Sequence, residues 1–241
     1  MEQELKFTIQ IANASHQDFA QIICDEMESS AKARGTGIAK RSPDYIKVKM
    51  REGKAVIAFT ENGIWAGFCY IETWSHGEYV ANSGLIVAPV FRKSGLAKNI
   101  KKKIFDLSQK LYPGAKLFGL TTGLAVMKIN SDLGYEPVTY SELTQDEAFW
   151  AGCKSCVNYE ILMSKERKNC MCTAMLYDPK DQKPEETSKD FVQHSKLYER
   201  FMKIKQWGLL KNLLRKEKVD IILSELGLFK QYKFKKGKLA K

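Results

Sequence analysis

The stretch Leu85-Ile86-Val87-Ala88-Pro89-Val90-Phe91-Arg92-Lys93-Ser94-Gly95-Leu96-Ala97-Lys98-Asn99-Ile100 decides the fold. It predicts a strand that Pro89 ends, a short basic loop, and a helix whose apolar residues recur at helical spacing from Ala97. Gly95 lets the backbone approach a ligand, and the free N–H groups of the first helical turn favour an anion. We interpret the loop as a pyrophosphate cradle, with an ordinary basic turn as the alternative.

The rest of the chain up to residue 179 alternates strand and helix patterns, and this predicts a mixed α/β (α+β) domain. Ser42-Pro43 begins a helix with Ser42 as its N-cap, and Asn62-Gly63 joins two strands as a hairpin. The expected strands other than the cradle strand (80–87) are Phe7–Ile11, Ala55–Glu61, Ile64–Glu72, Lys116–Thr121, Val138–Leu143 and Val157–Met163.

Two motifs resemble those of the GNAT superfamily of N-acyltransferases. A strand, the pattern Arg92-x-x-Gly95-x-Ala97 and a long helix resemble its acyl-CoA-binding motif, and Ala125–Tyr135 resembles its second motif, a short helix ending in Gly-Tyr. The resemblance spans about 7–163 and implies the GNAT fold, a mixed central sheet flanked by helices, for a domain at 1–179. It also implies that acetyl-CoA or succinyl-CoA is the co-substrate.

The resemblance further assigns residues to acyl-CoA. The strand before the cradle is expected to splay from its neighbour, so that the gap takes the pantetheine arm. Backbone contacts are expected from Leu85, Ile86 and Val87, and phosphate contacts from Arg92, Lys93, Ser94, Gly95, Leu96 and Ala97. A buried core strand is the other interpretation of Leu85–Val87, and the two are compatible because the contacts come from the backbone.

The catalytic candidates are Glu72 and Asn130. Acyl transfer to an amine needs a base near the strand ends, and Glu72, His76 and Glu78 lie there. Glu72 is favoured by its family position, with a solvated turn residue as the alternative for each. Many GNAT enzymes use a tyrosine as the general acid at the position where this chain has Asn130. The usual acid is therefore missing.

The basic loop residues Arg34, Lys40 and Arg41 are candidates for binding a substrate carboxylate, with a solvated basic loop as the alternative. The segments Gly35–Pro43, Glu72–Trp74 and Phe118–Met127 resemble a bacterial N-acetylglutamate synthase-type group of arginine biosynthesis. This resemblance implies acylation of the α-amine of a small anionic amino acid, L-glutamate. The alternatives are a protein, aminoglycoside or polyamine acetyltransferase and a non-catalytic acyl-CoA sensor.

Four late cysteines form two close pairs, Cys153-x-x-Cys156 and Cys170-x-Cys172. Four thiolates in such pairs can close a tetrahedral zinc site, so a structural zinc is one hypothesis. Buried free cysteines and a redox pair are the others.

The net charge of +11 is concentrated at the end of the chain. Residues 180–241 contain 17 Lys or Arg and 8 Asp or Glu, which gives +9. A polar linker precedes apolar residues at helical intervals, and this predicts a basic α-helical extension at 187–241. Because large apolar residues recur between the lysines, we expect it to bind a protein partner or a second copy rather than nucleic acid. No apolar run approaches the ~20 residues of a membrane span, and no signal peptide is evident, so a cytoplasmic protein is expected.

Overall fold

The computed structural model describes residues 6–35 and 40–181. The strands are β1 (Phe7–Ile11), β2 (Ala55–Thr60), β3 (Trp65–Trp74), β4 (Tyr79–Val87), β5 (Lys116–Thr121), β6 (Glu136–Val138) and β7 (Thr173–Tyr177). The α-helices are α1 (Ala20–Arg34), α2 (Pro43–Arg51), α3 (Leu96–Leu111), α4 (Leu124–Ser131), α5 (Glu147–Ala151) and α6 (Tyr159–Ser164). Short 3₁₀ helices are η1 (Ala14–Phe19), η2 (Ser75–Gly77), η3 (Pro89–Phe91), η4 (Tyr140–Glu142) and η5 (Gly152–Ser155).

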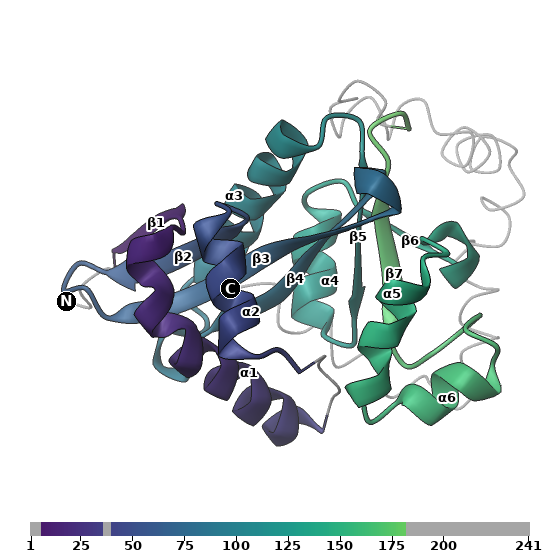
Figure 1. The fold of residues 1–241 in the computed structure, drawn as a ribbon, viewed down its shortest axis with the longest axis horizontal. Helices are drawn as coiled ribbons and strands as arrows, with labels where there is room; N and C mark the ends of the chain where they lie inside the picture. Colours follow the sequence, from purple (N-terminus) through teal and green to yellow (C-terminus); the bar gives the residue numbers. More distant parts are fainter. Residues whose placement is uncertain (1–5, 36–39, 182–241) are drawn as a thin grey trace, which may run out of the picture. The chain divides into compact units, whose positions relative to one another are not determined.

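The strands form one seven-stranded sheet in the order β1-β2-β3-β4-β5-β7-β6 (Figure 1). Every neighbouring pair is antiparallel except β4 and β5, which run parallel and are connected through α3. This arrangement confirms the predicted mixed sheet flanked by helices. It also places the cradle loop, which joins β4 to α3, at the end of a central strand.

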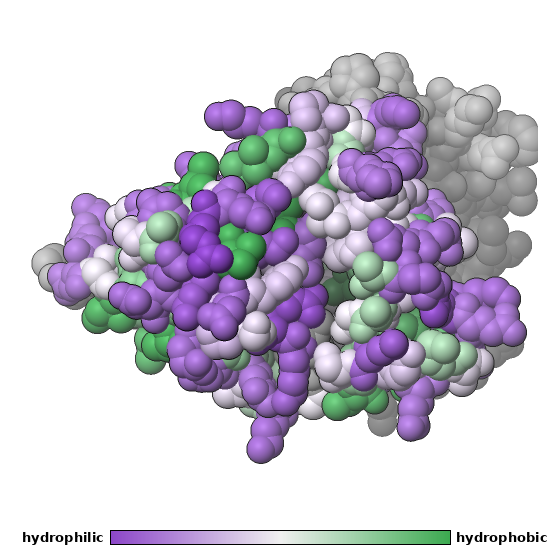
Figure 2. Space-filling view, in the orientation of Figure 1, coloured by the Kyte–Doolittle hydropathy of each residue, from purple (hydrophilic) through white to green (hydrophobic). Residues whose placement is uncertain are grey.

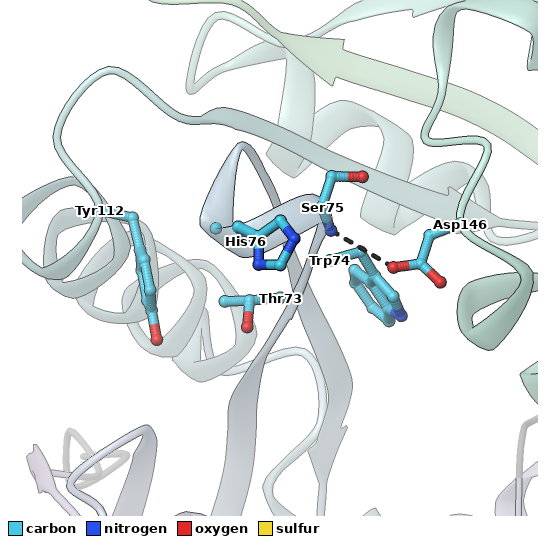
Figure 3. Close-up of a pocket in the computed structure, with 7 residues that line it drawn as sticks. Thr73, Trp74, Ser75, His76, Tyr112 and Asp146 are labelled. Atoms are coloured by element: carbon cyan, nitrogen blue, oxygen red, sulfur yellow. Dashed lines mark hydrogen bonds between the residues drawn. The ribbon is translucent and has the colours of Figure 1, made fainter.

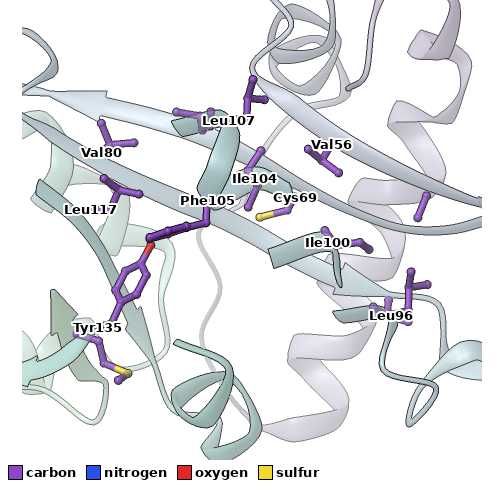
Figure 4. Close-up of a cluster of buried hydrophobic side chains, with 14 of the residues drawn as sticks. Val56, Cys69, Val80, Leu96, Ile100, Ile104, Phe105, Leu107, Leu117 and Tyr135 are labelled. Carbon is purple, nitrogen blue, oxygen red and sulfur yellow. The ribbon is translucent and has the colours of Figure 1, made fainter. Parts of the chain in front are cut away.

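Helices cover both faces of the sheet, with α1 and α2 on one face and α3 and α4 on the other (Figure 1). Strand β2 is buried on both sides: Ala55 and Ile57 pack under α1 and α2, whereas Val56 and Ala58 pack under α3. Figure 4 shows the α3 cluster, in which Ile100 and other side chains of α3 meet the strands. Successive strand residues point to opposite faces, and this explains why the strand is an uninterrupted apolar run.

The signals at the ends of α1 and α2 are those that the sequence predicts. Gly35 closes α1 in the left-handed conformation at φ +61°, where glycine has no Cβ penalty. The hydroxyl of Ser42 accepts a hydrogen bond from the N–H of Tyr45 at 3.2 Å, and Pro43 occupies the first position of α2. These caps fix where α2 begins, and therefore where Arg41 and Tyr45 lie over the sheet.

Two of the expected late strands are wrong. The segment Val157–Met163 contains α6, and Val138–Leu143 contains only the end of β6 before the turn η4. The strand that completes the sheet is β7, which pairs with both β5 and β6. Short apolar runs do not distinguish a strand from a helix by periodicity, and only the pairing partners decide. As a result, residues 139–172 form an insert of short helices between β6 and β7.

On the side that carries α1 and α2, the surface is mostly hydrophilic and is hollowed between α2 and α5 (Figure 2). Within residues 6–35 and 40–181, no helix combines the length and apolar character that a membrane crossing requires. The predicted basic extension at 187–241 lies outside the described residues.

Candidate active site

The cradle loop presents an uncapped helix N-terminus. Gly95 precedes α3 in the left-handed conformation at φ +81°, and no side chain in the described part of the chain caps the first turn. Lys93 also has a positive φ, +67°, so the backbone N–H groups of the loop do not point in the directions that a regular strand or helix would give them. A Cβ built on Gly95 would meet nothing within 4 Å, so the space over the loop is open. Open N–H groups at the positive end of a 16-residue helix can bind an anion.

Arg92 does not point into this space. Its guanidinium donates to the backbone oxygen of Val87 at 3.2 Å, to Glu26 at 2.9 Å and to the hydroxyl of Ser30 at 2.6 Å. The side chain therefore ties the end of β4 to α1, and the predicted phosphate contact is not made by a free guanidinium. Within the described residues no hydrogen bond or ion pair engages the side chain of Lys93, which leaves it as the cation beside the loop.

Strands β4 and β5 separate part-way along β4, six residues before it ends at Val87. They pair at only three positions, from Tyr79↔Lys116 to Ala81↔Phe118, and diverge afterwards. On its other edge β4 pairs with β3, but the register shifts between Phe68 and Tyr70, opposite Gly84 at φ +62°. We call the opening between β4 and β5 the fork. It lies beside Leu85, Ile86 and Val87, which is the splay that the resemblance implies.

Two buried asparagines stand at the fork. Asn82 is the first residue of β4 beyond the pairing with β5; its amide donates to Ser108 at 2.7 Å and accepts from the Tyr135 hydroxyl at 3.3 Å. Asn130 of α4 lies over β5, with its Nδ2 only 3.8 Å from a Cβ built on Gly119. Asn130 is 2% exposed, and its Oδ1 has no hydrogen-bond partner among the residues that the structure describes.

This geometry limits what Asn130 can do. Its Nδ2 makes only a weak 3.7 Å contact with the sulfur of Met175. An amide can donate or accept a hydrogen bond, but it has no proton to give at ordinary pH. Asn130 therefore cannot supply the acid that the resemblance places at this position, but a buried amide oxygen without a partner can accept a hydrogen bond from a ligand.

The two predicted active-site charges, Arg41 and Glu72, are paired with each other. Arg41 Nη2 donates to Glu72 Oε1 at 2.9 Å, and the side chains are only 18% and 10% exposed. The hydroxyl of Tyr45 donates to the same Oε1 at 2.7 Å, and Arg41 Nε donates to the Tyr70 hydroxyl at 3.1 Å. We call these four residues the Arg41–Glu72 cluster. Glu72 Oε2 makes no hydrogen bond to any residue that the structure describes, so this oxygen is the one available for a substrate.

The Arg41–Glu72 cluster lies directly on the fork. Glu72 pairs with Ala81, the last residue of β4 that reaches β5. The ring of Tyr70 occupies the space beside Gly84, because a Cβ there would lie 2.4 Å from Tyr70 Cε1. Paired residues share one face of a sheet, so Glu72 lies on the α2 side of the fork. Only glycine at the bulge allows Tyr70, and with it Arg41, to lie this close to the fork.

Burial and charge shift the pKa values in the cluster. Burial raises the pKa of the Tyr45 hydroxyl, and its hydrogen bond to Glu72 raises it further. Burial also raises the pKa of Tyr70. Burial opposes the charge of Arg41, but the oxygens of Tyr70, Glu72 and Tyr45 outweigh it and raise the Arg41 pKa. Both phenols are therefore neutral, Tyr45 donates to Glu72 and Tyr70 accepts from Arg41, and Arg41 is a fixed cation.

The other predicted substrate residues are placed differently. Lys40 pairs on the surface with Glu28 at 2.8 Å, where both side chains are more than 60% exposed. The side chain of Arg34 lies outside the described part of the chain. Sequence reasoning missed Tyr45, Tyr70 and Lys49. Tyr45 and Lys49 lie one helical turn apart in the helix that Ser42-Pro43 begins, so they share one face of it. Tyr70 and Glu72 are two positions apart on one strand, so they also share a face. Both spacings can be seen in the sequence.

The other base candidates, His76 and Glu78, lie in the turn at the far end of β4. A shallow cavity of about 410 Å³ there is lined by Thr73, Trp74, Ser75, His76, Gly77, Tyr112 and Asp146 (Figure 3). Strand β4 has nine residues, roughly 26 Å from this turn to the cradle. His76 is exposed and adopts φ +56°, while the neighbouring Ser75 N–H donates to Asp146 at 3.3 Å. Glu72 pairs with Ala81 at the fork, whereas His76 lies in the exposed turn beyond the paired strands, and this favours Glu72 as the base.

The four predicted zinc ligands lie around a single cavity of about 30 Å³ in the insert. In the described part of the chain, however, no group of three or more His, Cys, Asp or Glu side chains is arranged to hold a metal ion. Burial raises the pKa of Cys153 to about 11 and that of Cys172 to about 12, so both are protonated thiols near neutral pH. The structure therefore does not support the zinc hypothesis.

The insert nevertheless closes one side of the Arg41–Glu72 cluster. A Cβ built on Gly152 would lie 3.8 Å from Arg41 Nη2, and the Ser155 hydroxyl accepts from the N–H of Lys40 at 3.2 Å. The cluster is thus enclosed by β3, by α2 and by the turn η5.

Comparison with known proteins supports the fold. No protein-family model and no curated protein sequence matches this chain. Among solved structures, N-acetylglutamate synthase from Neisseria gonorrhoeae, complexed with coenzyme A and N-acetyl-glutamate, matches 72% of this chain with a TM-score of 0.51 and 15% identity. Rv2747 from Mycobacterium tuberculosis, in complex with CoA and NLQ, matches 71% of it with a TM-score of 0.52 and 14% identity.

The extent of these matches differs. The match covers 98% of Rv2747 but only 35% of the Neisseria gonorrhoeae synthase, so this chain corresponds to about a third of that protein. At these identities the matches establish the fold. The protein has the GNAT acyltransferase fold, as the cradle motif predicts.

Proposed function

We propose that this protein is an acyl-CoA-dependent N-acyltransferase that transfers an acetyl or succinyl group to the α-amine of L-glutamate. The observation that carries the proposal is the position of the Arg41–Glu72 cluster at the fork, whose other end opens on the cradle. One ligand can place phosphates at the loop and its thioester beside Glu72. From its resemblance to N-acetylglutamate synthases, we place the reaction in arginine biosynthesis in the cytoplasm.

The cradle and the fork account for the donor. The uncapped first turn of α3 suits the phosphates, and the diverging backbone of β4 suits the amide groups of the pantetheine arm. The unpartnered Oδ1 of Asn130 would accept a hydrogen bond from such an amide N–H. Acyl-CoA would thereby satisfy a buried polar atom that the protein leaves without a partner.

The reaction needs the amine to be neutral and aligned. Glu72 Oε1 is held by Arg41 and Tyr45, which leaves Oε2 to remove a proton from the substrate ammonium. The amine nitrogen then bonds to the thioester carbon, the carbon–sulfur bond breaks, and CoA leaves as its thiol after taking up a proton. Most of the rate enhancement in this scheme comes from alignment of the two reactants.

The charge of the site favours an anionic acceptor. Arg41 is a buried, fixed cation beside the position of the amine, and a substrate carboxylate can use its remaining N–H donors. A polyamine or a lysine side chain would bring positive charge to this cation without a compensating carboxylate. This is why we prefer an amino acid to the protein or polyamine alternatives.

A CoA-release assay tests the proposal. Acetyl-CoA and succinyl-CoA are each offered with glutamate, glutamine, ornithine, lysine and spermidine. We expect release above background with glutamate and little with spermidine. Release with spermidine or lysine but not with glutamate would replace the proposal with the polyamine or protein alternative. Tight acyl-CoA binding with no release for any amine would favour the non-catalytic sensor.

A further inference from the structure

Lys49 is a half-buried cation without an ion-pair partner in the described part of the chain. It lies on α2, and its Nζ is 5.1 Å from the centre of the Tyr45 ring. The nearby acid Glu52 is already paired with Lys54 at 2.9 Å. Burial lowers the pKa of the Lys49 ammonium, although the charge of Glu72 partly counteracts this. An unpaired charge that is partly removed from water is costly, and a bound anion would relieve the cost.

Lys49 and Arg41 lie close to the same aromatic ring. Arg41 Cζ is 5.3 Å from the Tyr45 ring centre, so the two distances add to an upper limit of 10.4 Å between Arg41 Cζ and Lys49 Nζ. Of the described acids near these two cations, Glu52 is paired with Lys54, and Glu72 has its Oε1 already engaged. The cluster therefore has room for additional negative charge.

The spacing suits a short dicarboxylate. The two carboxyl carbons of glutamate are joined by four carbon–carbon bonds of about 1.5 Å, so they lie about 5 Å apart when extended. With charge-assisted contacts of about 2.8 Å at each end, glutamate is long enough to reach two cations that lie no more than 10.4 Å apart. A monocarboxylate of the same length can engage only one of them.

We propose that Arg41 and Lys49 form a two-cation clamp that selects a dicarboxylic amino acid, with Lys49 as the specificity-determining residue. This inference rests on the proposed function and adds to it. Arg41 is the cation nearer the fork, because Tyr70 joins it to the bulge at Gly84. It holds the α-carboxylate beside the reacting amine. Lys49 lies beyond Tyr45 and holds the side-chain carboxylate.

Three variants test the clamp. Lys49→Gln removes the charge, and Lys49→Arg keeps it. The matched control is Lys47→Gln, which removes a cation from the same helix that is paired with Asp44 at 3.1 Å. For each protein, kcat/KM is measured with glutamate and with glutamine, and glutamate binding is measured by calorimetry in the presence of CoA.

We expect Lys49→Gln to lower the preference for glutamate over glutamine at least about 10-fold, mainly through KM, and to weaken glutamate binding similarly. Lys49→Arg and Lys47→Gln should retain the preference. An unchanged preference in Lys49→Gln, with glutamate still acylated, would overturn the clamp and leave the proposed function intact. If wild type fails to acylate glutamate, the proposed function is wrong, and the binding measurement decides the clamp by itself: glutamate binding that Lys49→Gln does not weaken overturns it.

Discussion

The two halves of the candidate active site are built in different ways. The donor half, the cradle and fork, is made mainly of backbone groups of β4 and of the loop that leads into α3, with β5 on the other side of the fork. The acceptor half is made of side chains from α2, β3 and the residues just before α2, and the insert closes its edge. Backbone sites depend on a few glycines and a helix end, whereas side-chain sites depend on pairs that meet only in the folded chain. Substitutions in the two halves should therefore impair different properties: acyl-CoA binding in the donor half, and the use of glutamate in the acceptor half.

The largest expected effect is at Gly95. Gly95→Glu puts a negative charge and a side chain at φ +81° into the open space over the first turn of α3. We expect acyl-CoA affinity to fall about 100-fold by calorimetry, because charge-assisted contacts to the phosphates are lost and replaced by repulsion.

Gly114→Glu is the matched control for this experiment. Gly114 follows the other end of α3, has φ +78°, and also has open space around its Cβ position. The two variants carry the same strain and the same added charge, so only Gly95→Glu should affect acyl-CoA. Equal acyl-CoA affinity in both folded variants would contradict the cradle.

The donor half was predictable because its signals are contiguous. Gly95, the β-branched run before it and the apolar helical spacing after it lie within sixteen residues, and each acts through local backbone geometry. The fork followed only from the family resemblance, since no local pattern states that β4 and β5 diverge after Ala81. The orphaned oxygen of Asn130 could not be predicted, because it depends on its packing beside Gly119.

The acceptor half was predicted only in part. Arg41 and Glu72 were each chosen as candidate site residues, but they were not predicted to form an ion pair, because residues 31 positions apart meet only through the sheet and α2. Contacts between distant residues also explain why two of the late strands were predicted wrongly. The run Tyr159–Ser164 is short and apolar, and it forms α6 because β7 takes the place beside β5.

The second effect concerns Arg41. Arg41→Ala should raise KM for glutamate about 10- to 150-fold and change KM for acyl-CoA much less, because the lost contact is to the acceptor. It should also lower the free energy of unfolding by about 3 kcal/mol, because Glu72 is left buried without its cation. Lys40→Ala is the control, since its exposed pair with Glu28 contributes little. Equal KM values for glutamate in the two variants would refute the acceptor role of Arg41.

A smaller effect distinguishes the two asparagines at the fork. Asn130→Leu removes an unsatisfied buried oxygen, so thermal or urea unfolding should show a protein that is more stable by about 1 kcal/mol. Acyl-CoA affinity should fall about 10-fold, because a hydrogen bond to the ligand is lost. Asn82→Leu should instead destabilise, because the buried Tyr135 hydroxyl loses its acceptor and the Ser108 hydroxyl loses its donor, keeping only its bond to the backbone oxygen of Ile104. A destabilised Asn130→Leu with unchanged acyl-CoA affinity would show that Asn130 is only a packing residue.

The smallest effect on activity is expected in the insert. Its four cysteines allow a test of whether the edge of the acceptor half depends on a metal. Protein purified without chelator should contain no stoichiometric zinc, because no described group is arranged to bind one. The pKa values of Cys153 and Cys172 are raised to about 11 and about 12, chiefly by burial, so the folded state binds these protons more tightly than the unfolded state does. Their contribution to stability is then complete below about pH 9, the ordinary thiol range, and is lost as pH rises through 11 and 12.

Reaction with a thiol reagent at pH 8 should be slow at these two positions relative to the same residues in the unfolded chain, and glutamate KM should not respond to a chelator. This conclusion would be reversed if the protein contained one zinc per chain and if a chelator removed it and raised the glutamate KM. The metal would then support the edge of the acceptor half.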